Sequence, residues 1–208
     1  MKNSYALITG ASSGIGEEIA KNLAKKGYNL ILTARREDLL DKLAQDLRKK
    51  YNIDVSVIAK DLSKYETPKE ILSFCEKNNY RVDLLVNNAG YGIKTSFHQT
   101  SLEDEEDFIR VLGTSVIMLT KLFLPKMISN GEGKIMIVSS TAAFAPPSAI
   151  QPLYGPIKTF VNRFSDSINI NYKNKGITST AVCPGFTVTG FHTALSLIHI
   201  SEPTRRAI

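Results

Sequence analysis

Short apolar stretches alternate with longer amphipathic ones along this chain, and that alternation constrains the fold more than any other feature. The short runs are apolar at most positions, which is typical of strands covered on both faces. They occupy residues 4–9, 29–34, 53–59, 82–87, 134–140 and 177–183. The longer stretches have helical character and occupy residues 14–26, 37–51, 68–79, 102–130 and 153–175. This order predicts an α/β fold with a doubly wound parallel sheet.

Size and charge narrow the class of protein further. The chain of 208 residues has no linker-like stretch and predicts a single domain. Its net charge of +6 is spread along the helical stretches, which favours a solvated surface over a nucleic-acid site. No apolar run is expected to reach membrane-spanning length, and a strand beginning at residue 4 leaves no room for a signal peptide. These features predict a soluble, cytoplasmic protein that binds neither nucleic acid nor membrane.

Two groups of residues invite a metal-site interpretation. Cys75 and Cys183 lack the spacing of metal ligands, and a reduced cytosolic chain needs no disulfide between them. The acidic segment TSLEDEED is better explained as a helix start, with Thr100 and Glu103 as a capping box. No metal is therefore predicted.

The first predicted strand runs directly into the sequence TGASSGIG, which places Gly10, Gly14 and Gly16 at a strand-to-helix turn. Such glycines let the backbone approach a pyrophosphate at the positive end of the following helix. A glycine-rich turn alone is a weak indication, because tight turns also need glycine for steric reasons.

Further motifs follow the other strands in order: Asp61-Leu62, NNAG at residues 87–90, Ser140, Tyr154-x-x-x-Lys158 and CPGFTVT at residues 183–189. Together with TGxxxGxG, this ordered set resembles the short-chain dehydrogenase/reductase family, from residue 4 to about residue 191. The resemblance implies a Rossmann-type fold, homo-oligomers built on residues 102–130 and 153–175, and an NADP(H) site. The implied cofactor contacts are Gly10, Ser12, Ser13, Gly14, Ile15, Gly16, Arg35, Asp61, Leu62, Asn88, Ala89, Gly90, Tyr154, Lys158, Pro184, Gly185, Val188 and Thr189.

The end of the second strand predicts which dinucleotide binds. NAD-selecting enzymes place Asp or Glu there for the ribose hydroxyls, whereas this chain has Ala34 followed by Arg35 and Arg36. A guanidinium matches phosphate oxygens, so NADPH is predicted, with Arg35 as the primary contact. The alternative is that both arginines simply face solvent. A basic residue that many NADP binders of the family carry before the second glycine is absent, because Ser13 stands there.

Tyr154, Lys158 and Ser140 are the predicted catalytic residues. Tyr154 and Lys158 are four residues apart on a predicted helix and share one face. An ammonium close to the phenol would lower the tyrosine pKa toward working pH. The resemblance implies that Tyr154 exchanges a proton with the substrate oxygen, that Lys158 also binds the nicotinamide ribose, and that Ser140 orients the substrate.

Two positions depart from the family pattern. Ser140 precedes Tyr154 by one residue more than expected, which predicts an insertion in the loop around Pro146 and Pro147. Leu112 stands where the family usually has a catalytic Asn, and leucine can neither donate nor accept a hydrogen bond. Ser115, one helical turn on, is a possible substitute. These departures leave two interpretations open: an NADPH-dependent oxidoreductase acting on a carbonyl or secondary alcohol, and a nucleotide-binding scaffold or regulator with impaired catalysis.

The segment LSLIHISEPTR, residues 195–205, resembles one translated reading frame of a transposase sequencing adapter. This resemblance predicts a native domain over residues 1–194 that stops before the last strand of its fold. Residues 195–208 would then be a non-native tail without a function.

Overall fold

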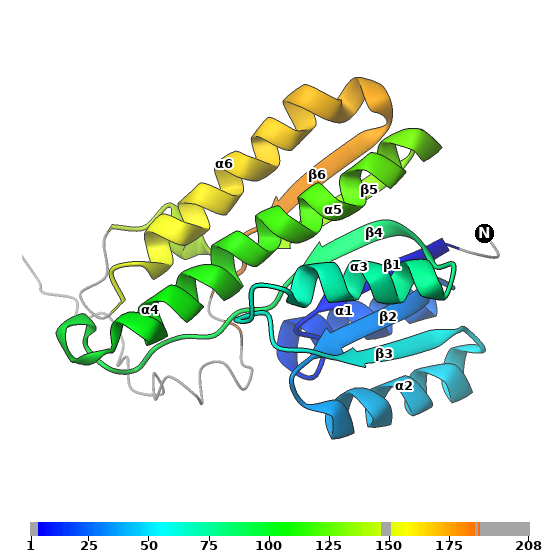
Figure 1. The fold of residues 1–208 in the computed structure, drawn as a ribbon, viewed down its shortest axis with the longest axis horizontal. Coiled ribbons are helices and arrows are strands. Elements are labelled where there is room, and N and C mark those ends of the chain that lie inside the picture. The colour runs from blue at the N-terminus through cyan, green and yellow to red at the C-terminus, as the bar shows by residue number, and fades with distance from the viewer. Residues whose placement is uncertain (1–3, 147–150, 186, 188–208) are drawn as a thin grey trace, which may run out of the picture.

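A six-stranded parallel sheet forms the centre of the computed structural model, which describes residues 4–146, 151–185 and 187 (Figure 1). The strands are β1 (Ser4–Thr9), β2 (Asn29–Ala34), β3 (Val55–Ala59), β4 (Arg81–Asn87), β5 (Gly133–Val138) and β6 (Ile177–Val182). Their order is β3-β2-β1-β4-β5-β6, so the strand order reverses between β1 and β4. The predicted doubly wound parallel sheet is therefore confirmed, with its ligand crevice expected at the carboxyl ends of these strands.

Helices cover both faces of the sheet. The helices are α1 (Gly14–Lys25), α2 (Glu37–Tyr51), α3 (Thr67–Lys77), α4 (Leu102–Ile109), α5 (Ser115–Asn130) and α6 (Tyr154–Tyr172). Residues of α3, α5 and α6 share one core with Leu7 and Leu85 of the sheet. Residues of α1 and α2 share a second core with Ile8 and Leu32 on the opposite face. The alternation of side chains along each strand thus divides the apolar residues between two cores.

The stretch predicted as one helix over residues 102–130 contains a π-helical turn, Arg110–Thr114, between α4 and α5. A π-helical turn inserts an extra residue into the helical period, which a pattern of apolar positions does not reveal. The predicted capping box is wrong by one residue. Ser101 is the N-cap of α4, and its hydroxyl accepts a hydrogen bond from the Asp104 amide at 3.1 Å. Thr100 instead donates to the Glu105 carboxylate at 2.6 Å.

The expectation that no apolar run reaches membrane-spanning length is also wrong. The continuous helical segment Leu102–Asn130 is long and apolar enough to cross a membrane. However, 56% of its most apolar window is buried inside the fold. Phe108, Leu119 and Met127 of this segment belong to the core against the sheet. The segment is apolar because these side chains pack in the core of the fold.

Candidate active site

The glycine-rich turn joins β1 to α1 in a conformation that only glycine permits. Gly10 has a φ of +66°, and a Cβ on Gly16 would lie 2.3 Å from the Gly10 carbonyl oxygen. Any larger residue at position 16 would push the helix away from the strand. Ser13, the N-cap of α1, makes no side-chain capping bond to the helix. The turn therefore leaves helix amides for another acceptor, and the pyrophosphate of a dinucleotide fits that requirement.

A hydrogen-bonded brace connects this turn to the NNAG segment after β4. The Asn88 side-chain amide donates to the carbonyls of Thr9 and Gly10 at 2.8 and 3.2 Å. The Thr9 hydroxyl accepts from the amides of Asn88 and Ala89 at 2.9 and 3.0 Å. The sequence motifs do not indicate Thr9 as a site residue, although it is the first letter of TGASSGIG. The brace fixes both walls of the crevice where the strand order reverses.

Arg35 and Arg36 both follow β2 and are exposed, but they have different neighbours. The Arg36 guanidinium contacts the two serines of the glycine-rich turn, Ser12 and Ser13. Burial raises the pKa of the Tyr91 phenol to about 12. The positive charge of Arg35 lies close enough to oppose that increase. The structure thus places both arginines at the crevice. It brings Arg36, which the sequence did not single out, to the turn.

The other predicted cofactor contacts also gather at the carboxyl edge of the sheet. Asp61 follows β3 and accepts a hydrogen bond from the Ser63 amide at 2.9 Å, while Leu62 is buried. The Pro184 carbonyl after β6 accepts from the Thr141 amide at 3.0 Å, which brings Pro184 and Gly185 beside the Ser140 segment. Val188 and Thr189 lie outside the described residues.

Tyr154 and Ser140 meet at the end of β5. Tyr154 is the first residue of α6 and is half-buried, and Ser140 begins the 3-10 turn that follows β5. The Ser140 hydroxyl accepts from the Ala142 amide at 3.1 Å, which fixes its position. Its hydrogen bond with Tyr154 lowers the pKa of the phenol, although burial has the larger effect and leaves that pKa raised. Tyr154 is therefore protonated near neutral pH and can act as a proton donor.

Lys158 lies one turn further along α6 and is almost fully enclosed, with 6% of its surface exposed. Its ammonium donates to the Val138 carbonyl at 2.8 Å, and its own carbonyl accepts from the Ser139 hydroxyl at 3.1 Å. Burial lowers the pKa of Lys158 to about 8, and the nearby Cys183 opposes that change. Lys158 is thus a buried cation near neutral pH, placed at the end of β5.

The prediction that Lys158 lowers the pKa of Tyr154 is wrong for this structure. The two residues share a helix face as predicted, but the ammonium lies 5.6 Å from the centre of the tyrosine ring and bonds to Val138 instead. Spacing along a helix fixes the shared face, whereas the direction of a long side chain depends on its bonding partners. Desolvation of the phenol therefore decides its pKa.

Leu112 lies in the π-helical turn, where it is 2% exposed and packs beside Gly90 of NNAG. A Cβ on Gly90 would lie 3.7 Å from the Leu112 side chain. Ser115 faces inward, as a substitute for the missing Asn would require, and is 2% exposed. Its hydroxyl donates to the Val111 carbonyl at 2.8 Å, so that proton is already committed to the helix backbone.

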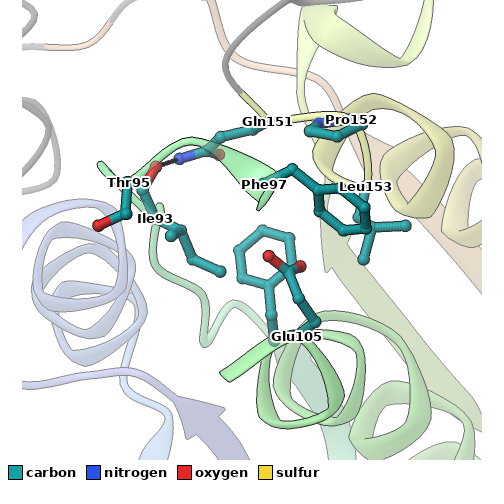
Figure 2. Close-up of a pocket in the computed structure, with 8 residues that line it drawn as sticks. Ile93, Thr95, Phe97, Glu105, Gln151, Pro152 and Leu153 are labelled. Atoms are coloured by element: carbon teal, nitrogen blue, oxygen red, sulfur yellow. Dashed lines mark hydrogen bonds between the residues drawn. The ribbon is translucent and has the colours of Figure 1, made fainter. Parts of the chain in front are cut away.

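A small hollow opens between the segment after β4 and the residues that lead into α6 (Figure 2). Ile93, Phe97 and Leu153 face it from these segments, with the Glu105 carboxylate at its edge. The Gln151 side chain donates to the Ile93 carbonyl and ties the two segments together. The free space inside the hollow is only about 10 Å³, room for about one water molecule and far below the ~300–1,000 Å³ of most ligand pockets. The hollow is therefore too small, as it stands, to hold a substrate group.

An aromatic row links this hollow to the cofactor crevice. The rings of Tyr91 and Phe108 meet edge-to-face at 5.4 Å, and those of Phe108 and Tyr154 lie 6.4 Å apart. These contacts hold the loop after β4 against the helix that carries the tyrosine.

Sequence relatives share most of this chain. A very-long-chain 3-oxoacyl-CoA reductase from Danio rerio is 32% identical over 206 residues, covering 96% of this chain and 61% of the relative. A Homo sapiens protein of the same name is 30% identical over 207 residues, covering 96% of this chain and 62% of the relative. The chain thus spans about three-fifths of the length of these curated relatives.

Solved structures of dehydrogenases share the fold of this chain. A short-chain dehydrogenase from Sphingobium yanoikuyae in complex with NADPH is 32% identical, with a TM-score of 0.87 over 93% of this chain and 75% of that one. An alcohol dehydrogenase from Thermococcus sibiricus complexed with 5-hydroxy-NADP is 30% identical, with a TM-score of 0.82 over 92% of this chain and 80% of that one. The sequence model of the family described as short chain dehydrogenase matches residues 4–197. This chain therefore belongs to the short-chain dehydrogenase family.

Proposed function

We propose that this protein is an NADPH-dependent oxidoreductase that reduces a carbonyl group to a secondary alcohol, and that the reverse oxidation uses the same residues. The hydrogen bond between Ser140 and Tyr154, at the carboxyl edge of the sheet, is the observation that carries the proposal. The NADPH and NADP complexes of the similar solved structures support the choice of cofactor. The uncapped amides of α1 and the two arginines after β2 support it from this chain's own residues.

The residues of the site have distinct roles in this proposal. When bound, NADPH would supply a hydride from its nicotinamide ring. Tyr154 donates its phenolic proton to the carbonyl oxygen, and the neighbouring Ser140 hydroxyl turns its single proton to that oxygen and orients it. Lys158 provides a fixed positive charge close to the tyrosine ring. Its enclosure and its bond to Val138 hold that charge in place.

An acyl thioester with a ketone at its third carbon is the first substrate class to test. The relatives named very-long-chain 3-oxoacyl-CoA reductases support this choice. The test measures NADPH oxidation with 3-oxoacyl thioesters of increasing chain length and with simple ketones and aldehydes as controls. Oxidation that increases with chain length supports the proposal, and no oxidation with any carbonyl compound contradicts it.

The catalytically impaired scaffold stays the second candidate, and Leu112 is the observation that favours it. Leu112 is buried beside Gly90, so no polar side chain is available at that position. A scaffold would bind NADPH without oxidising it in the presence of any substrate in the panel. The cytoplasmic location and the homo-oligomer stay proposals too. The exposed side chains of Phe160 on α6 and Ile117 on α5 support the latter.

A further inference from the structure

Five helices end at the same end of the sheet, opposite the crevice. Because α1, α2, α3, α5 and α6 each lead back to the start of a parallel strand, their last turns lie at the amino ends of the strands, near the N-terminus (Figure 1). We call these last turns, with the loops that follow them, the amino-end surface. It comprises residues 22–28, 48–54, 74–80, 127–132 and 169–176.

The amino-end surface is strongly basic. It contains eight basic and three acidic residues, a net charge of +5. The rest of the described chain contains 15 basic and 16 acidic residues, a net charge of −1. The eight basic residues are Lys25, Lys26, Arg48, Lys49, Lys50, Lys77, Lys173 and Lys175. Positive charge that is spread along the sequence is therefore gathered by the fold at one end of the molecule.

These eight cations are exposed and not neutralised. No ion pair within residues 4–146, 151–185 and 187 includes any of them. Two of the three acids have other partners, since Asp54 accepts from the Tyr5 hydroxyl at 2.5 Å and Glu132 lies 3.6 Å from Arg81. The helix dipole favours a lysine at the end of each helix. Five helix ends side by side turn that local preference into one positive surface.

Tyrosine and isoleucine side chains accompany the charges. The Lys50 ammonium lies 5.4 Å from the centre of the Tyr51 ring at the end of α2. The Lys175 ammonium lies 5.7 Å from the centre of the Tyr172 ring at the end of α6. Ile170, in the last turn of α6, is 84% exposed. Tyrosine rings, lysine stems and an exposed apolar side chain suit the boundary between lipid headgroups and acyl chains. Bases of a nucleic acid stack on open ring faces, and lysine occupies one face of each of these rings.

We infer that the amino-end surface binds an anionic lipid membrane. This inference goes beyond the proposed function and departs from the sequence-based expectation that the protein binds no membrane. A negatively charged leaflet attracts basic side chains that come within about one Debye length of it. The acidic first turn of α4, with Glu103, Asp104 and Glu105, lies toward the opposite end of the molecule (Figure 1). The membrane would repel that end, so the candidate active site would face the NADPH in solution.

The test is sedimentation of the full chain with lipid vesicles. One set contains phosphatidylcholine alone, and the other contains equimolar phosphatidylcholine and phosphatidylserine. The wild type should bind only the second set, and added salt should release it. The pair Lys49→Gln and Lys50→Gln on α2 should weaken this binding on the order of 10-fold, and so should the pair Lys173→Gln and Lys175→Gln after α6.

A matched control removes the same charge elsewhere. Lys64 and Lys121 are exposed and lie outside the amino-end surface, so Lys64→Gln with Lys121→Gln should change vesicle binding by less than about twofold. Equal loss in this control, no binding by the wild type, or equal binding to both vesicle sets overturns the inference. Tighter binding to oligouridylate RNA than to the anionic vesicles also overturns it. The oxidoreductase proposal does not depend on these outcomes, because it is tested by NADPH oxidation in solution.

Discussion

Lys158→Met should make this protein more stable at neutral pH, although it removes a proposed catalytic residue. Burial lowers the Lys158 pKa from 10.5 to about 8. The difference corresponds to about 3 kcal/mol of unfavourable free energy for holding the ammonium in the folded protein. Methionine has a similar shape and no charge to desolvate. The Val138 carbonyl loses its donor, which costs about 1 kcal/mol, so a net gain of about 2 kcal/mol is expected at pH 7.

The two pKa values of Lys158, in the folded and in the unfolded chain, also determine how the stability changes with pH. Below pH 8 the lysine is protonated in both states, so the folded protein carries the whole penalty. Between about pH 8 and 10.5 the unfolded chain keeps the proton while the folded protein has lost it. Wild-type stability therefore gains from this residue as pH rises through that window, and the advantage of the methionine variant should disappear by about pH 10.5.

Urea unfolding of both proteins without cofactor, at several values from pH 7 to 10.5, measures this effect. The difference between the two proteins is needed, because other groups act in the opposite direction. Burial raises the Cys75 pKa to about 12, so deprotonation of that thiol in the unfolded chain lowers stability as pH rises. Such contributions are common to both proteins and cancel in the difference. A difference that does not change with pH, or a variant several kcal/mol less stable at pH 7, would refute the reasoning.

Three further substitutions test cofactor selection, proton delivery and self-association. Arg35→Asp should move the ratio of kcat/KM values from NADPH toward NADH, since a carboxylate repels a 2′-phosphate and accepts from ribose hydroxyls; an unchanged ratio removes Arg35 from cofactor selection. Leu112→Asn should raise the single-turnover rate by less than ~10²-fold and cost about 2–4 kcal/mol in urea unfolding, because a buried leucine is replaced by an amide. A stably folded variant that is no faster shows that position 112 does not limit proton delivery. Phe160→Glu should lower the molar mass measured by light scattering if α6 joins copies of the chain, and an unchanged mass excludes this face.

Much of the fold could be predicted because both sheet faces are covered and the strands are consequently apolar at most positions. The six strands differ from the expected ranges by at most two residues at either end, and the ordered motifs correctly mark the carboxyl edge of the sheet. The pattern could not reveal the π-helical turn at Arg110–Thr114, since apolar side chains continue on both sides of it. The pattern of apolar residues also did not indicate that the segment Leu102–Asn130 is long and apolar enough to cross a membrane.

The site was predictable at the level of which residues meet, and less so in how they interact. Tyr154, Lys158 and Ser140 come together as expected, because a four-residue spacing and a strand end determine their positions. Whether Lys158 turns to the phenol or to Val138 depends on local acceptors that spacing does not encode. The same holds for the adjacent arginines. Arg36 reaches Ser12 and Ser13 while Arg35 does not, and only the three-dimensional structure distinguishes them.

Transfer of deuterium from NADPH deuterated at the transferable C4 position tests the central claim most directly. With a 3-oxoacyl thioester as acceptor, the wild type should place the deuterium on the carbon that bears the new hydroxyl group. Tyr154→Phe should bind NADPH with an unchanged dissociation constant and yield no deuterated alcohol, because the proton donor is missing. Deuterated product from the phenylalanine variant at the wild-type rate would contradict the role of Tyr154. Tight NADPH binding by the wild type without deuterium transfer to any carbonyl compound would contradict the assignment as an oxidoreductase.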